Sequence, residues 1–250
     1  MRALPPQAPP RFEIRILANA AEAARAAAQE VADAAADAIT RRDVFRVAFS
    51  GGTTPARLFD TLATPRFRRR VDWGRTRVFF VDERSVPPSH ERSNYRLAKE
   101  HLLDPLQVPR ANVFRMRGED EPRRAAVTYE KILRQEFGGR TPRFDLVLLG
   151  LGADGHTASL FPESPALNEK TRWVAANPGP SPEERRVTLT LPVLNAGRRV
   201  DFLVAGKDKA GVVATVVGKK PGYRKLPASR VRPARGSLIW ILDESAAAQL

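Results

Sequence analysis

The residues best suited to chemistry lie in the stretch GLGADGHTASLFP, residues 150–162. A carboxylate, Asp154, stands two positions before an imidazole, His156, in a glycine-rich turn. An imidazole changes protonation near neutral pH, and a nearby carboxylate can orient it or a water molecule, so the pair is typical of general base catalysis. A lone histidine is more often structural, but the position of this one after an apolar run favours a catalytic role.

A second group of chemically useful residues follows a strand-like segment and comprises Ser50, Gly51, Gly52, Thr53 and Thr54. The residues after it predict a helix over 55–62, with Thr54 as N-cap and Pro55 at its first position. Backbone N–H groups and the positive end of a helix dipole attract an anion at such a place. A tight turn without a ligand explains the same pattern. The pattern is not a nucleotide P-loop, because GxxxxGK[ST] is missing.

Three charged residues, Asp82, Glu83 and Arg84, follow a predicted buried strand over 77–81. A charge at such a place must form an ion pair or serve a function. One interpretation is an internal ion pair. The other gives Arg84 the stabilisation of negative charge on an oxygen, and Asp82 contacts with substrate hydroxyls. Lys209 follows another predicted strand and is interpreted as a phosphate contact or as a surface lysine.

Two patterns that suggest a cofactor lack the context they need. Gly150, Gly152 and Gly155 match GxGxxG, but Pro162 would cut the following helix short and no strand ending in an acid lies about 20 residues on. His90 shares a loop with acidic residues, yet there is no cysteine and no second histidine at ligand spacing. The sequence therefore predicts neither a metal nor an organic cofactor.

The elements that must position these residues alternate along the chain. Helices are predicted over 18–40, 55–62, from 93 onward, 119–137 and 208–217, and strands over 44–49, 77–81, 144–150, 173–176, 187–191, 200–205 and 238–242. Alternation implies right-handed crossovers and an α/β, Rossmann-like, mostly parallel sheet with helices on both faces. Ligands bind beyond the carboxyl ends of such strands, so we expect His156 and residues 50–54 to open into one shared cleft.

Composition limits the class of protein. The 250 residues include no cysteine, and no apolar run approaches the roughly 18 residues of a membrane span. We expect residues 1–12, with their four prolines, to be a flexible lead-in without targeting features, and residues 13–250 to form a single catalytic domain in the cytoplasm. We also expect a monomer or weak homodimer.

The net charge of +14 has a compositional explanation, because only 8 of the 42 basic residues are lysines and alanine is abundant. An anionic small substrate and nucleic acid are the alternatives. The arginines are scattered, and there is no zinc-finger spacing, aromatic RNA-binding strand or basic zipper. The sequence therefore favours a small anion over nucleic acid.

Several segments together resemble the 6-phosphogluconolactonases. The matching blocks are AFSGGTTP (48–55), FFVDERSVPPSHERSNYRLAKEHLL (79–103), FDLVLLGLGADGHTASLFP (144–162), RVTLTLPVLNAGRRVDFLVAGKDKA (186–210), LPASRVRP (226–233) and LIWILD (238–243). The resemblance implies a deaminase/isomerase-like fold and hydrolysis of a phosphorylated sugar lactone without a cofactor. It implies His156 as base, phosphate binding by residues 50–54 with Lys209, and Asn94 among the substrate-binding residues.

Glucosamine-6-phosphate deaminases share this architecture and a similar DGH segment, and a sugar-phosphate-binding module is a non-enzymatic alternative. In the deaminase family an asparagine and a glutamate follow the DGH turn before the proline, whereas here Phe161 precedes Pro162. The lactonase interpretation is preferred. One departure from the lactonases is that no lysine occurs between residues 171 and 206. Arg185 or Arg186 replaces that charge; Arg186 is the residue we assign to substrate binding.

Overall fold

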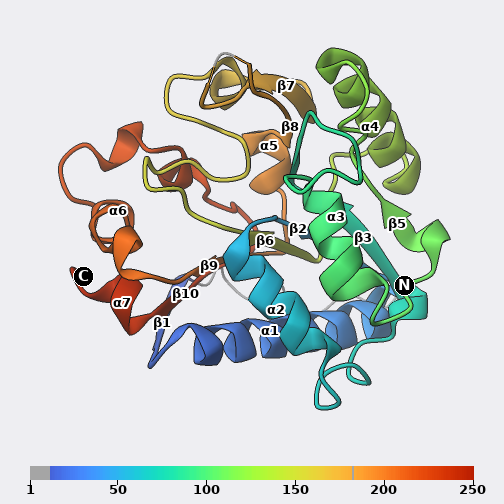
Figure 1. Cartoon of the computed structure of the whole chain (residues 1–250), viewed down its shortest axis with the longest axis horizontal. Helices are drawn as coiled ribbons and strands as arrows, with labels where there is room; N and C mark the ends of the chain where they lie inside the picture. The colour runs from blue at the N-terminus through green and yellow to red at the C-terminus, as the bar shows by residue number, and fades with distance from the viewer. Residues whose placement is uncertain (1–11, 182) are drawn as a thin grey trace, which may run out of the picture.

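A parallel sheet of seven strands forms the centre of the protein in a computed structural model that describes residues 12–181 and 183–250 (Figure 1). Its order is β1 (Phe12–Leu17), β10 (Ser237–Asp243), β9 (Arg199–Val204), β6 (Leu146–Leu149), β2 (Phe45–Phe49), β3 (Thr76–Phe80) and β5 (Val113–Phe114). All neighbouring strands in it run parallel, as the alternation of strands and helices predicts. The proposed lead-in falls outside the described residues except for Phe12, which already belongs to β1.

Helices cover both faces of this sheet, which confirms the α/β prediction. One face packs against α1 (Ala20–Arg42), α2 (Thr53–Ala63) and α3 (Asn94–Ala98). The other packs against α4 (Pro122–Glu136), α5 (Leu191–Leu194), α6 (Ala210–Val217) and α7 (Glu244–Ala247). Figure 1 shows α1 below the sheet and α4 and α5 above it. Small alanine side chains let α1 lie close to the strands, since most of its alanines are buried.

The second sheet was not predicted. It has the antiparallel order β4 (Asp82–Arg84), β8 (Arg185–Leu189) and β7 (Val174–Pro178). The sequence predicts the last two as strands, but we expected Asp82–Arg84 to be the end of the strand before it. After Val81 the chain instead leaves the parallel sheet and pairs with β8, and the N–H of Leu189 donates to the carbonyl of Val81 at 2.7 Å.

The N-terminus of α2 differs from the prediction by two residues. Its N-cap is Gly52, not Thr54, and no side chain caps the helix. Gly52 has φ +108°, a conformation that residues with a Cβ rarely adopt, so the glycine lets the chain enter the helix two residues earlier than Pro55 suggests. The first-turn N–H groups consequently have no side-chain acceptor of their own.

Candidate active site

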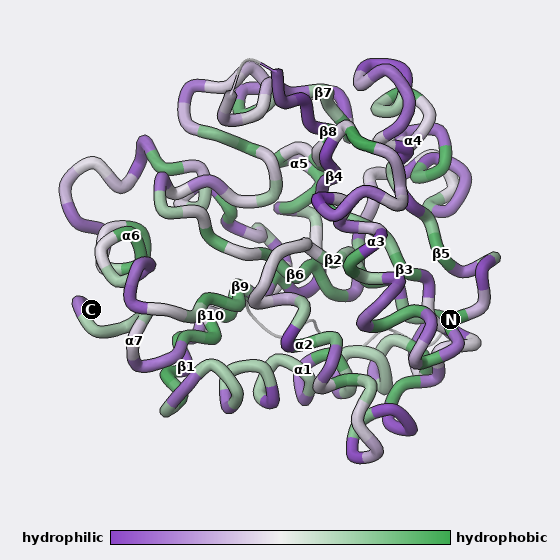
Figure 2. The backbone as a smooth tube through the Cα atoms, in the orientation of Figure 1, coloured by the Kyte–Doolittle hydropathy of each residue, from purple (hydrophilic) through white to green (hydrophobic). Residues whose placement is uncertain are grey.

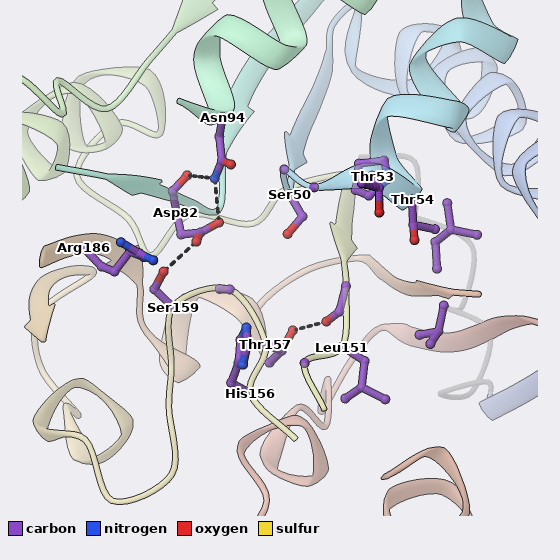
Figure 3. A pocket seen from close by; sticks show the side chains of 18 of the residues that line it. Ser50, Thr53, Thr54, Asp82, Asn94, Leu151, His156, Thr157, Ser159 and Arg186 are labelled. Carbon is purple, nitrogen blue, oxygen red and sulfur yellow. Dashed lines mark hydrogen bonds between the residues drawn. The ribbon is translucent and has the colours of Figure 1, made fainter. Parts of the chain in front are cut away.

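A cavity of about 310 Å³ opens at the carboxyl ends of β2, β6 and β9. Of the twelve residues expected from the sequence, all except Asp154 line it. His156 and residues 50–54 therefore share one cavity, as the sequence analysis requires. Figure 3 shows Thr53 and Thr54 on one side of the cavity and Asp82 and Arg186 on the other, with His156 below them.

Asp154 stands behind His156 rather than in the cavity. Its Oδ1 lies 2.5 Å from the Nδ1 of His156 and accepts the backbone N–H of His156 at 3.1 Å. A carboxylate accepts hydrogen bonds, so Nδ1 carries the hydrogen and Nε2 keeps its lone pair for a proton. The ring of Phe161 lies against the imidazole, with 4.7 Å between ring centroids.

The turn before His156 is shaped by two glycines. Gly155 has φ +80°, which turns the chain back so that the N–H of Gly152 bonds the carbonyl of His156 at 2.9 Å. A Cβ on Gly152 would lie 2.0 Å from the Nδ1 of His156. The imidazole therefore occupies the space that the missing side chain leaves.

The segment Ser50–Thr54 joins β2 to the N-terminus of α2 and lines the cavity with backbone and hydroxyl groups. The first-turn N–H groups of a helix lack intrahelical acceptors, and the helix dipole adds partial positive charge. With no side-chain cap on α2, these donors remain for a ligand. Such an arrangement suits a phosphate.

Across the cavity from Thr53 and Thr54, Asp82 is the centre of a buried hydrogen-bond cluster. Its Oδ1 accepts from the Nδ2 of Asn94 at 3.2 Å, and its Oδ2 accepts from the hydroxyl of Ser159 at 2.6 Å. Asn94 Nδ2 also donates to the Asp82 carbonyl at 3.0 Å, so the amide orientation is fixed. The Asn94 Oδ1 is buried without a hydrogen-bond partner among the described residues. That oxygen packs against Gly51, on which a Cβ would lie 1.9 Å from it.

Glu83 has a structural position next to this cluster. Its carboxylate accepts the N–H groups of Arg84, Asn94 and Tyr95, each at 2.8 Å, and so holds the N-terminus of α3. Burial raises the pKa of Glu83 above its ordinary value, although these backbone donors act in the opposite direction. Glu83 thereby fixes the place of Asn94.

Three cationic side chains line the cavity. Arg84 donates to the carbonyl of Arg92 at 2.6 Å, Lys209 lies 3.1 Å from Asp208, and Arg186 pairs with Glu184 at 2.5 Å. Arg185 and Arg186, the two candidates to replace the lysine that other lactonases carry, differ in position. Arg186 is buried and lines the cavity, whereas Arg185 is exposed and does not.

Sequence reasoning missed three residues of the site. Ser159 contacts Asp82, and Phe161 contacts His156. The hydroxyl of Thr157 donates to the carbonyl of Gly150 at 2.9 Å, which holds the turn to the end of β6. All three lie within five residues of His156, and that closeness was the available signal. Their partners become visible only when distant segments meet.

Within residues 12–181 and 183–250, no helix is long and apolar enough to cross a membrane. No group of three or more histidine, cysteine or acidic side chains in the same ranges is arranged to hold a metal ion.

Comparison with known proteins gives consistent matches. The family model for glucosamine-6-phosphate isomerases/6-phosphogluconolactonase matches residues 18–240. A human protein named 6-phosphogluconolactonase is 41% identical over 238 residues, 94% of this chain and 92% of its own length. One from Synechocystis is 40% identical over 217 residues, 85% of this chain and 88% of its own.

Solved structures agree with these matches. The 6-phosphogluconolactonase from Trypanosoma cruzi superimposes with a TM-score of 0.86 at 30% identity, covering 98% of each chain. A monomeric glucosamine-6-phosphate deaminase superimposes with a TM-score of 0.78 over 95% of this chain and all of its own, at 17% identity. The second match shows a common fold only.

Proposed function

The chain belongs to the family of glucosamine-6-phosphate isomerases and 6-phosphogluconolactonases, and on that premise we propose that it hydrolyses 6-phosphoglucono-1,5-lactone to 6-phosphogluconate. This is the second step of the oxidative pentose phosphate pathway. The names of relatives at 40% and 41% identity support the reaction. The observation that carries it is one cavity in which an imidazole held by Asp154 faces a phosphate-binding turn.

In the proposed mechanism, the substrate phosphate binds to residues 50–54 and Lys209, which places the lactone carbonyl near His156. The Nε2 of His156 takes a proton from water while the water oxygen attacks the carbonyl carbon. The tetrahedral intermediate then collapses with cleavage of the bond to the ring oxygen. The same imidazole returns its proton to that oxygen, and the new carboxylic acid ionises in solution.

The other cavity residues bind and stabilise the substrate. Arg84 stabilises the oxyanion, and Arg186 adds positive charge on the side of the cavity away from Thr53 and Thr54. Asp82 accepts from sugar hydroxyls. Asn94 lines the cavity and holds Asp82 in place through its amide group. No step requires a metal or an organic cofactor.

We assign the activity to residues 13–250 as one catalytic unit in the cytoplasm. Both sides of the cavity come from distant parts of this range, Ser50 in one half and Lys209 in the other. Neither part alone contains the whole site.

Phe161 argues against deaminase chemistry in this cavity. The deaminase family has a carboxylate in the corresponding turn for ring opening and proton transfer, and here an aromatic ring packs on His156 instead. An aromatic ring moves no proton. The lactonase reaction needs only the one base.

The test is a coupled assay in which freshly generated lactone is followed through 6-phosphogluconate dehydrogenase, with and without the protein. We expect hydrolysis well above the spontaneous rate. A parallel assay measures ammonia release from glucosamine 6-phosphate and is expected to show none. Saturable binding of sugar phosphates without turnover would instead support a binding module and refute the proposal.

A further inference from the structure

The outer edge of the seven-stranded sheet carries an unusual apolar surface. Strand β1 pairs with β10 on one side, and no strand among the described residues pairs with its other side. Phe12, Ile14 and Ile16 alternate along it and are 58%, 40% and 52% exposed. Only two other large hydrophobic side chains in the described ranges are exposed, Val127 and Leu250. Figure 2 shows hydrophobic colour along β1 at the margin of the molecule.

An edge of this kind normally carries protection against pairing with another chain, such as lysine, proline or a bulge. The sequence FEIRIL of β1 has no lysine or proline, and its six residues pair in register with β10. Its two charges point to the other face, where Arg15 contacts Glu13 at 2.6 Å and Glu30 of α1 at 2.5 Å. The face of β1 that carries Phe12, Ile14 and Ile16 is therefore apolar and exposed, and the only protection that the strand itself carries is the pair of charges on its inner face.

We propose that β1 pairs antiparallel with β1 of a second copy of this chain, about a two-fold axis through Ile14. In this register Ile14 faces Ile14 of the second copy, and Phe12 faces Ile16. Glu13 faces Arg15 of the second copy, so opposite charges meet twice across the interface. The same patch serves both subunits, as a two-fold interface requires, and joins the two sheets into one.

The charge pattern of β1 favours a second copy of this chain as the partner. A shift of the axis by one residue puts Glu13 opposite Glu13 or Arg15 opposite Arg15, so like charges meet, and of these three registers only the one centred on Ile14 pairs opposite charges. A six-residue edge buries less than the roughly 1,600 Å² of a standard interface, so we expect dissociation in about the 10 µM to 1 mM range. β10 separates β1 from β9, the nearest strand that lines the cavity, so pairing leaves the cavity untouched.

Single cysteines test the register directly, because the chain contains none. Two-fold pairing puts the Cα atoms of residue 14 about 4.5–5.5 Å apart, within disulfide range, so Ile14→Cys forms a covalent dimer on mild oxidation. Phe12→Cys puts its two sulfurs roughly 13 Å apart along the strands and does not. The double variant Phe12→Cys/Ile16→Cys crosslinks again. Val127→Cys, an exposed apolar position on α4, is the control for random collision.

Sedimentation equilibrium from about 1 µM to 1 mM measures the dimer without a covalent bond. We expect a reversible monomer–dimer equilibrium that Ile14→Lys shifts at least ten-fold toward monomer and Val127→Lys does not. Equal lactonase kcat in both variants shows that they fold. A wild-type monomer at 1 mM, or crosslinking of Ile14→Cys no faster than of Val127→Cys, overturns the proposal; inactivity of the wild-type chain would not.

Discussion

His156 owes its proposed role to the contact of its Nδ1 and to the position of its ring in the cavity. Nδ1 is committed to Asp154 at 2.5 Å, and the ring lines the cavity. Replacing His156 with alanine removes the base but leaves the phosphate-binding turn intact. We expect kcat to fall about 10²- to 10⁴-fold with little change in KM, measured in the coupled assay. His101→Ala is the control, because that histidine pairs with Asp60 outside the cavity; equal losses in both variants would contradict the assignment.

Arg186 and Arg185 are adjacent in β8 and offer a matched pair. The side chain of Arg186 is buried at the cavity, and that of Arg185 lies on the outside. A charged hydrogen bond contributes about 1.5–3 kcal/mol, so Arg186→Gln should lower kcat/KM for the lactone roughly 10- to 100-fold. Arg185→Gln should stay within a factor of about two. If Arg185→Gln lowered kcat/KM more than Arg186→Gln, the residue that replaces the lysine of other lactonases would be Arg185.

The turn between β6 and His156 contains two glycines that can be tested separately. A Cβ on Gly152 would lie 2.0 Å from the Nδ1 of His156 and 2.7 Å from Asp154 Oδ1, whereas one on Gly150 would meet nothing within 4 Å. Gly152→Ala must therefore displace the imidazole. Since a displacement of about 1 Å can cost 10²-fold in rate, we expect kcat to drop by roughly that factor in Gly152→Ala, with Gly150→Ala close to wild type.

KM for the lactone is the second measurement on the two glycine variants. It should change little in either, because the phosphate-binding turn is a separate element. A large rise in KM with unchanged kcat in Gly152→Ala would show that this turn binds substrate instead of holding the base.

The strand-loop-helix units around the site were predictable because their signals are local. Apolar runs identify β2 and β6, and glycines mark the turns that follow them. The sheet β4–β8–β7 was not predictable as a sheet, since β4 has only three residues, all charged, and its pairing with β8 joins positions about a hundred residues apart. The cap of α2 was misplaced because Thr54 and Pro55 give a strong local signal, while φ of Gly52 depends on the backbone around it.

The same division holds for the site. Residue types and strand ends predicted which side chains meet in the cavity. They did not predict that Asp154 stands outside it, or that Ser159 holds Asp82. Those contacts depend on side-chain directions that no local pattern encodes.

The seven-stranded sheet encloses an ionisable side chain, Asp201, that the proposed mechanism does not use. Asp201 in β9 is fully buried, and neither of its carboxyl oxygens has a hydrogen-bond partner in the described part of the chain. The charged groups that act on it are Glu13 and Arg15 of β1, Glu30 of α1 and Arg199 of β9. With Asp201 ionised, this group has three carboxylates and two guanidinium groups, so protonation of Asp201 balances the charge.

Burial raises the pKa of Asp201 from 3.8 to about 8, and this shift makes the stability of the whole fold depend on pH. Between these two values the folded chain holds a proton on Asp201 that the unfolded chain has lost. Folding therefore takes up a proton, and stability falls as pH rises, by at most about 1.4 kcal/mol per pH unit, until it levels off above about 8. Asp201→Asn is neutral throughout, so the wild type should lose stability relative to this variant from pH 5 to 8. Urea unfolding at each pH measures the difference; curves that stay parallel over this range would mean that Asp201 is ionised inside the sheet.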